Sequence, residues 1–301
     1  MRAVLSIITL ITLALLGAGC SPNRSADSSG RLGVVAAFYP IQAAAQAVGG
    51  EHVHVTNLTA PGVEPHDLEL TPDAVEEIQS ADLVLYFGGG FQPAVEDAIP
   101  GASGEAVDLL AGLPTVAPPA GQSEGTSVDP HVWLDPELYG ELVGEVDTAL
   151  TKLAPADAST FHANAAALED DLSSLDRDYA AGLAHCARDV IVTNHAAFGY
   201  LAAHYGLTQE AISGLAPDAE PSAARLAQLR TLVEREGVTT IFTEELVPPD
   251  VAETLANEAG VQTRVLATIE GLTAEEQAAG DTYDSLMRQN LATLEAALGC
   301  S

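Results

Sequence analysis

The feature that most constrains the fold is a long central segment, 157–184, which contains no glycine or proline before Gly182. It is the longest helix-compatible stretch in the chain. Apolar side chains recur in it at steps of three and four residues, which places them on one face of a helix: Leu168, Leu172, Leu175 and Tyr179. We predict one long, rigid helix over 157–185 that joins two halves of the molecule.

Strand-like and helix-like segments alternate on both sides of this helix. In the first half, apolar runs at 33–39, 52–58, 82–88 and, more weakly, 106–110 alternate with helical patterns. One of these helices starts with Thr71 as cap and Pro72 at its first position. The second half repeats the theme, with strands expected at 188–194, 208–214, 238–244 and 262–268 and a last helix at 281–298. The alternation predicts an α/β fold with two doubly wound lobes, 33–156 and 186–301, whose sheets are mainly parallel.

The N-terminus has the composition of an export signal. Arg2 precedes an apolar run over 4–16, and small residues lead to Cys20. We expect residues 1–20 to be a signal peptide whose lipobox ends at Cys20, the acylated residue; an ordinary signal with an unmodified Cys20 is the alternative. The polar segment 21–32 is expected to be a flexible tether. The protein is therefore expected in the periplasm or on the outer face of the cytoplasmic membrane, held by an N-terminal lipid anchor.

Charge and cysteine content narrow the possible functions. The formal net charge is −32, from 11 basic and 43 acidic residues, and clustered Lys and Arg for binding nucleic acid are lacking. Two cysteines, Cys186 and Cys300, remain after the signal. An exported chain meets an oxidising compartment, so we expect a disulfide between them, with two separate thiols as the alternative.

Three histidines lie at positions where a predicted strand or loop ends and a predicted helix follows: His66, His131 and His195. Ligands of open α/β sheets lie beyond the carboxyl ends of the strands. His66 belongs to the first lobe and His195 to the second, so a metal that they share must lie between the lobes. Asp281, before the last helix, is the candidate carboxylate ligand, although position alone does not favour it over Glu244.

Further carboxylates are candidates for orienting the ligand histidines from behind, as is common at metal sites: Asp67, Asp129, Glu244 and Glu245. The other five histidines are interpreted as exposed, paired on a strand edge or placed near helix ends, and are not assigned as ligands: His52, His54, His162, His185 and His204.

Four segments resemble one known family, the solute-binding lipoproteins of metal-ion ABC importers, and within it the zinc-binding branch. They are PGVEPHDLELTP, DPHVWLDP, VTNHAAFGYLAAHYGL and GDTYDSLMRQNL, and the resemblance extends from about residue 33 to the end. It implies two lobes joined by a long helix, and one Zn(II) held between them by the residues matching His66, His131, His195 and Asp281. Manganese- and iron-type members often have glutamate at the position of His195. Many zinc members carry a histidine-rich loop, whereas segment 114–129 has no histidine.

The sequence thus predicts an extracytoplasmic receptor, not an enzyme, that captures Zn(II) and delivers it as a monomer to an ABC permease. Three imidazoles and one carboxylate close a tetrahedron and favour zinc. One alternative is a manganese or iron receptor of the same fold. A zinc hydrolase is less favoured because it needs an open coordination position, and the chain has no H-E-x-x-H motif. The sequence neither supports nor excludes a surface adhesin.

Overall fold

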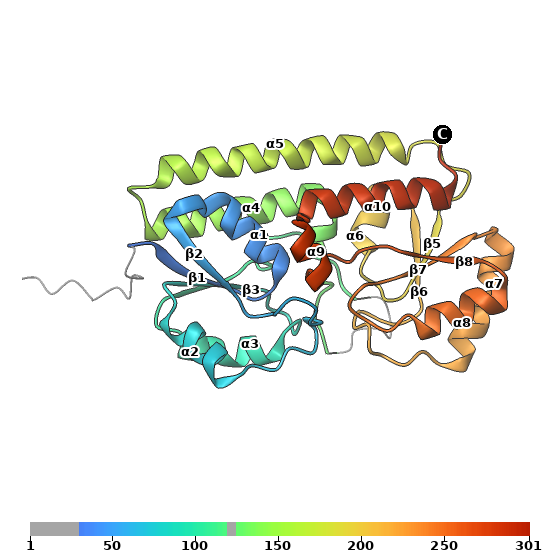
Figure 1. Ribbon diagram of the computed structural model, residues 1–301, viewed down its shortest axis with the longest axis horizontal. Helices are drawn as coiled ribbons and strands as arrows, with labels where there is room; N and C mark the ends of the chain where they lie inside the picture. Colours follow the sequence, from blue (N-terminus) through green and yellow to red (C-terminus); the bar gives the residue numbers. More distant parts are fainter. Residues whose placement is uncertain (1–29, 119–124) are drawn as a thin grey trace, which may run out of the picture.

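The computed structural model describes residues 30–118 and 125–301. The predicted signal peptide, Cys20 and residues 21–29 of the expected tether lie outside the described residues. So does part of the loop 114–129. Two α/β lobes lie side by side, and a layer of long helices runs along both of them (Figure 1).

The N-terminal lobe contains a four-stranded parallel sheet in the order β2-β1-β3-β4. Its strands are β1 (Leu32–Ala36), β2 (Val53–Asn57), β3 (Leu83–Tyr86) and β4 (Glu105–Asp108). The C-terminal lobe repeats this topology in the order β6-β5-β7-β8, also all parallel. Its strands are β5 (Val190–Thr193), β6 (Thr208–Ala211), β7 (Thr240–Thr243) and β8 (Gln262–Val265). In both lobes the first strand in sequence has neighbours on both sides, which creates a topological switch point at its carboxyl end.

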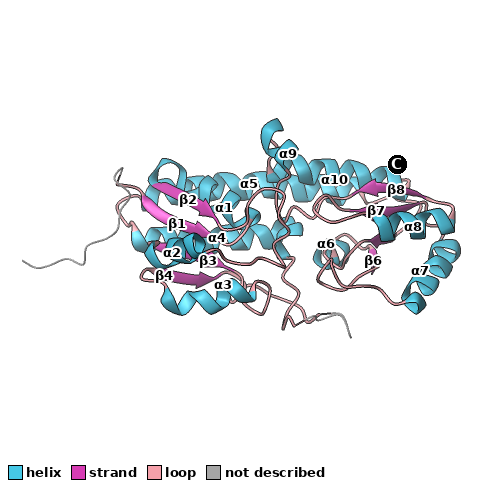
Figure 2. Cartoon of the chain, turned by 60° about the horizontal axis from the view of Figure 1, so that its bottom comes forward, coloured by secondary structure: helices cyan, strands magenta, loops and turns pink. Residues whose placement is uncertain are grey.

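Helices cover both faces of each sheet (Figures 1 and 2). Those of the N-terminal half are α1 (Tyr39–Gly49), α2 (Pro72–Ser80), α3 (Pro93–Ala98), α4 (Pro136–Leu153) and α5 (Ala158–Gly182). Those of the C-terminal half are α6 (Gly199–His204), α7 (Ala223–Glu236), α8 (Asp250–Ala259), α9 (Ala274–Ala279) and α10 (Tyr283–Leu298). Short 3-10 turns are η1 (Gly50–His52), η2 (Ile99–Gly101) and η3 (Val132–Leu134). The predicted fold class, two α/β lobes with parallel sheets, is confirmed.

Local sequence accounts for several helix starts. Thr71 caps α2 by accepting a hydrogen bond from the backbone N–H of Ala74, and Pro72 occupies the first helical position. Asp135 caps α4 in the same way through the backbone N–H groups of Glu137 and Leu138. The last helix, predicted over 281–298, is α10, which Thr282 caps. The short helix α9 before it was not predicted and ends at Gly280 in a left-handed conformation.

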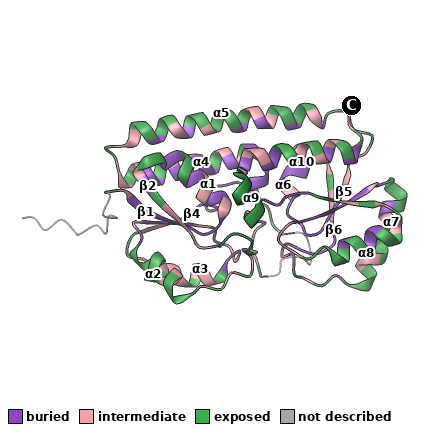
Figure 3. Ribbon diagram, in the orientation of Figure 1, coloured by how far each residue is buried: buried purple, intermediate pink, exposed green. Residues whose placement is uncertain are grey.

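The hydrophobic core follows the alternation of side chains along each strand. Val34 and Ala36 face the helix layer and belong to the largest cluster, whereas Val35 points to the opposite face. In the second lobe, Ile191 faces the helix layer and Val192 the opposite face. The largest cluster therefore extends without a break from one lobe to the other, beneath α4, α5 and α10 (Figure 3).

The helix α5 runs along both lobes and packs its apolar stripe against this core. The hydroxyl of Tyr179 donates a hydrogen bond to the carbonyl of Met287 in α10 at 2.7 Å. Just beyond α5, Cys186 forms a disulfide with Cys300 at the end of α10, as predicted. The second lobe is thus tied to the linker helix at two places, near the start of α10 and just beyond its end.

In the described part of the chain, no helix is long and apolar enough to cross a membrane.

Candidate metal centre

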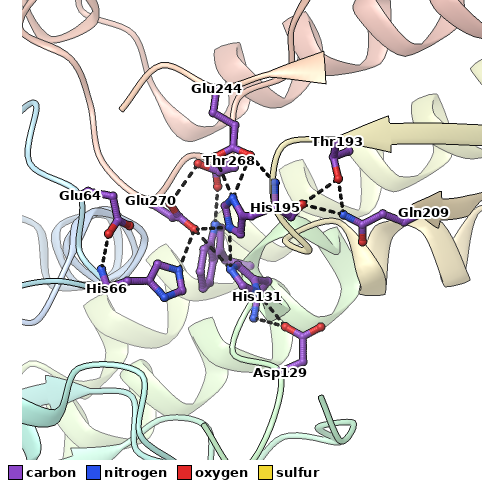
Figure 4. A network of polar contacts seen from close by, with 11 residues as sticks. Glu64, His66, Asp129, His131, Thr193, His195, Gln209, Glu244, Thr268 and Glu270 are labelled. Carbon is purple, nitrogen blue, oxygen red and sulfur yellow. Dashed lines mark hydrogen bonds and ion pairs between the residues drawn. The ribbon is translucent and has the colours of Figure 1, made fainter. Parts of the chain in front are cut away.

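Connections at the carboxyl ends of the strands bring four side chains together between the lobes. His66 lies in the irregular segment between β2 and α2, and His131 directly precedes η3 in the same lobe. His195 follows β5 by two residues, and Glu270 lies in the segment between β8 and α9. Each lobe supplies two residues to this group, which we call the primary site (Figure 4).

The donor atoms of the primary site have the spacing of a tetrahedral metal centre. Glu270 Oε1 lies 3.3 Å from the Nε2 atom of each of the three histidines. The Nε2 atoms of His131 and His195 are 3.2 Å apart. Four ligands that each stand about 2.0–2.1 Å from a zinc ion lie about 3.3 Å from one another. The four side chains therefore suit a small tetrahedral cation.

Two of the imidazole rings are held from behind by carboxylates. His131 Nδ1 is 2.8 Å from Asp129 Oδ1, and His195 Nδ1 is 2.8 Å from both oxygens of Glu244. The same carboxylates accept the backbone N–H groups of the two histidines. With Nδ1 protonated and engaged, each Nε2 lone pair points to the centre of the site, which is the usual support of a metal-bound histidine.

The pairing of His195 with Glu244 follows from the sheet order. Strands β5 and β7 are neighbours, so the residues just beyond them meet at the switch point. Asp129 reaches His131 differently, because only Pro130 separates them in sequence and the chain before η3 folds the carboxylate back. Asp129 and Glu244 were both predicted to orient candidate ligand histidines, and each lies within hydrogen-bond distance of one of these histidines.

The segment carrying Glu270 is fixed by contacts with the other lobe. The indole N–H of Trp133 donates to the carbonyl of Thr268 at 2.8 Å, and the Thr268 hydroxyl lies 3.2 Å from Glu270 Oε2. Between them, buried Ile269 has φ 57°, the one positive φ of a non-glycine residue in the described ranges. A β-branched residue in this region is strained by roughly 1–3 kcal/mol. The backbone is therefore bent at some cost where it presents Glu270.

Aromatic rings form a dry wall on the N-terminal side of the primary site. Phe91 meets His66 edge to face at 4.7 Å between ring centroids, and Trp133 lies 5.1 Å from His131. Phe38 contacts both Phe91 and Trp133. The side chains of His131, His195 and Glu270 are at most 1% exposed. Water is thus largely excluded, which strengthens electrostatic interactions inside the site.

Burial and the mutual charges shift the pKa values of these groups. Burial opposes protonation of His195, but the carboxylates of Glu244 and Glu270 outweigh it and raise its pKa well above 6.5. Burial also favours the neutral form of Glu270, yet the surrounding histidines hold the pKa of this carboxyl well below its usual value. Glu270 is therefore an anionic donor among imidazoles.

A second carboxyl near the site, that of Glu64, has the opposite shift. Burial and the charge of Glu270 raise the pKa of Glu64 to about 8. One of its oxygens accepts the backbone N–H of His66, while the other is buried without a hydrogen-bond partner. Glu64 is therefore mostly a neutral carboxyl at pH 7, beside the anionic Glu270.

The structure does not bring Asp281, predicted as the carboxylate ligand, to the three histidines, and Glu270 occupies that place. Asp281 lies beyond α9, where its Oδ1 atom accepts a hydrogen bond from Ser285 in the first turn of α10. It lines a separate hollow together with Tyr39 and Gln42. The intervening α9 carries the chain away from the histidines, and Asp281 supports the side chain of Ser285, which belongs to the capping box that Thr282 forms at the start of α10.

Glu270 was not predicted, although like His195 it lies beyond the carboxyl end of a strand of a parallel sheet. It lies five residues beyond β8, at the crevice end of a strand, and that position was the one available signal. Asp67 and Glu245, also predicted to support ligands, are not brought against them. Asp67 is exposed, and Glu245 is half-buried beside Glu244, where burial raises its pKa to about 7.

Comparison with known proteins identifies the family. The family model described as zinc-uptake complex component A, periplasmic, matches residues 34–297. The zinc-binding lipoprotein AdcA of Streptococcus pneumoniae is 38% identical over 97% of the chain, and the chain spans 60% of that protein's length. The high-affinity zinc uptake system protein ZnuA of Bacillus subtilis is 36% identical, with 94% of each chain covered.

Solved structures give the same result. The Zn(II)-bound ZnuA-like domain of Streptococcus pneumoniae AdcA is 39% identical, with a TM-score of 0.76 over 89% of this chain and 99% of that one. The laminin-binding protein Lmb of Streptococcus agalactiae, described as a bifunctional adhesin and metal transporter, is 28% identical with a TM-score of 0.81, at the same coverage. The chain therefore belongs to the ZnuA family, the periplasmic A components of zinc-uptake complexes.

Proposed function

We propose that this protein is the extracytoplasmic receptor of a zinc importer: it binds one Zn(II) at the primary site and delivers it to an ABC permease. The observation that carries the proposal is the convergence of three imidazoles on one carboxylate. Glu270 Oε1 lies 3.3 Å from each Nε2 atom, and all four donor atoms lie within 4.8 Å of one another. The names of the relatives, zinc-binding and zinc-uptake proteins, support the same cargo.

The donor chemistry favours zinc over manganese. Imidazole nitrogen suits zinc, whereas manganese prefers oxygen donors and a higher coordination number. Because four protein donors complete a tetrahedron, no position is left for a reacting water, so the proposed role is binding and not hydrolysis.

The cargo must enter and leave a buried site. Of the three histidines, His66 is the one whose side chain is slightly exposed, at 5% against 0% for the other two. It lies on the irregular segment between β2 and α2, whereas α4, α5, α10 and the shared core fix the other elements. We therefore propose that this segment opens when the receptor docks on its permease, while the lobes keep their relative position. The protein is proposed to act as a monomer, anchored outside the membrane through acylated Cys20.

The deciding experiment is metal competition on purified, metal-free protein. One equivalent of Zn(II) should bind tightly, and a large excess of Mn(II) should not displace it. His131→Ala should abolish tight binding, because its ring is fully buried between Asp129 and Glu270. Preferential retention of Mn(II), or tight zinc binding by the His131→Ala variant, would refute the proposal.

A further inference from the structure

A second group of possible ligands lies outside the primary site, where both lobes meet the linker helix. It consists of Glu137 in the first turn of α4, Asp176 in α5 and His204 at the end of α6, and we call it the α4–α6 cluster. One donor atom of each residue lies within 4.8 Å of the others. The three residues come from the N-terminal lobe, the linker helix and the C-terminal lobe (Figure 1).

The imidazole of this cluster is oriented as in a metal site. His204 Nδ1 is 2.9 Å from Oδ2 of Asp135, which is itself buried and fixed as the cap of α4. His204 Nε2 faces the two other carboxylates, at 3.5 Å from Asp176 Oδ1 and 3.9 Å from Glu137 Oε2. A carboxylate therefore holds the Nδ1 atom of His204, and its Nε2 atom faces the other possible ligands, as in the arrangement around His131 and His195.

Further contacts hold two of the side chains of the cluster in place, which is unusual for an ion pair on the protein surface. The hydroxyl of Tyr205 donates to Asp176 Oδ1 at 2.9 Å, and the rings of His204 and Tyr205 stack at 4.4 Å. His204 and Asp176 are only 25% and 21% exposed, whereas Glu137 is 70% exposed and free to swing in. An open hollow of 350 Å³ is lined by Glu137 and Asp176 and gives water access to these two carboxylates.

We propose that the α4–α6 cluster is a second, weaker binding site for a divalent transition metal such as Zn(II). One imidazole and two carboxylates, with water as the fourth ligand, suit Zn(II) and keep the overall charge of the site near neutral. Binding should be weaker than at the primary site because the cluster has one imidazole instead of three and is open to water. A cation here would clamp the two lobes and α5 together.

The test counts the zinc bound by the metal-free protein at equilibrium, by dialysis followed by elemental analysis, with Zn(II) alone as the probe. Wild type should bind one equivalent tightly and a second more weakly. Glu137→Gln and His204→Gln should each bind only the tight equivalent. Glu137→Gln is the safer variant, because an exposed side chain of the same shape is replaced.

His162→Ala is the matched control. This exposed histidine also pairs with a carboxylate, Asp147, at 2.6 Å, but it belongs to neither metal group found among the described residues. It should retain both equivalents. A single equivalent in wild type, or the same loss in the control as in the cluster variants, would overturn the inference. Loss of the tight equivalent alone in His131→Ala separates this site from the primary one.

Crystals soaked in Zn(II) give an independent measurement. An anomalous peak at the zinc edge, about 2.0–2.1 Å from His204 Nε2, is expected in wild type and should be missing in the Glu137→Gln crystal. A zinc peak at the primary site with none beside His204 would reject the second site and leave the proposed function intact.

Discussion

The imidazoles of His131 and His195 each lie between a carboxylate and the centre of the primary site, and this support is expected to matter for affinity. Glu244→Gln should weaken zinc binding by about 10–100-fold, because an amide does not fix the His195 ring as the charged carboxylate does. Competition with a chromogenic chelator measures the change. Glu245→Gln, at the neighbouring half-buried carboxyl, is the control and should change the affinity little.

The identity of the carboxylate ligand is tested by a pair of isosteric variants. Glu270→Gln removes the anion that lies 3.3 Å from all three imidazoles and should weaken zinc binding by more than about tenfold, a change of at least about 1.4 kcal/mol. Asp281→Asn should leave the affinity unchanged, because that side chain lies outside the primary site, where it accepts a hydrogen bond from Ser285. Isothermal titration of both variants gives the comparison, and an equal loss in the two would restore Asp281 as a candidate.

Sequence alone identified the three histidines because each stands in a distinctive segment at the end of a strand or loop. The fourth residue could not be found in this way. Glu270 and Asp281 both precede a helical segment, and the choice between them depends on the path of the chain around α9 and on the bend at Ile269. Such a path is decided by tertiary contacts, here with Trp133, that no local pattern encodes.

At the scale of elements, the segment between β8 and α9 depends on the opposite lobe for its shape. Trp133→Phe removes the hydrogen bond to the buried carbonyl of Thr268 and should reduce stability by about 1–3 kcal/mol. Since that segment carries Glu270, zinc affinity should fall as well. Calorimetry and zinc titration measure the two effects.

Phe87→Leu is the matched change. It also removes volume from the aromatic cluster that includes Phe38 and Trp133 but does not touch Thr268. We expect lower stability with nearly unchanged affinity. If both variants lost affinity alike, general loosening of the core and not the hydrogen bond would explain the effect.

The elements themselves were largely predictable, since strands of this type are short apolar runs and Thr71 with Pro72 marks a helix start. The structure also contains the long helix α5 within the predicted segment. The last helix was predicted to within two residues of α10, whereas the short helix α9 was missed although its capping residues Thr273 and Glu276 were visible in the sequence. The sheet order, which brings Glu244 to His195, requires knowledge of which strands pair.

At the scale of the whole molecule, the disulfide joins Cys186 and Cys300 across 114 residues of sequence. Closing so large a loop restricts the unfolded chain, so replacing both cysteines by serine should reduce the free energy of unfolding by about 2–5 kcal/mol. Chemical denaturation measures the loss. Zinc binding should persist in the folded variant because the bridge lies at the far end of α10, and lost affinity at unchanged stability would contradict this account.

Zinc itself should stabilise the protein because both lobes contribute ligands. At a free zinc concentration of about one hundred times the dissociation constant, binding adds about 2.7 kcal/mol to the free energy of unfolding. Thermal melts with and without a chelator should show the difference. His131→Ala, which lacks a buried ligand, should melt at nearly the same temperature in both conditions.

The continuous hydrophobic core beneath α4, α5 and α10 limits how a permease could distinguish the metal-bound receptor from the empty one. Two lobes that share one hydrophobic core cannot rotate apart about a hinge without exposing that core to water. The overall shape of the molecule would then be almost the same with and without bound metal. A permease would have to recognise the conformation of the one surface segment that carries His66. Discrimination would rest on a few side chains at the rim and not on a change of shape.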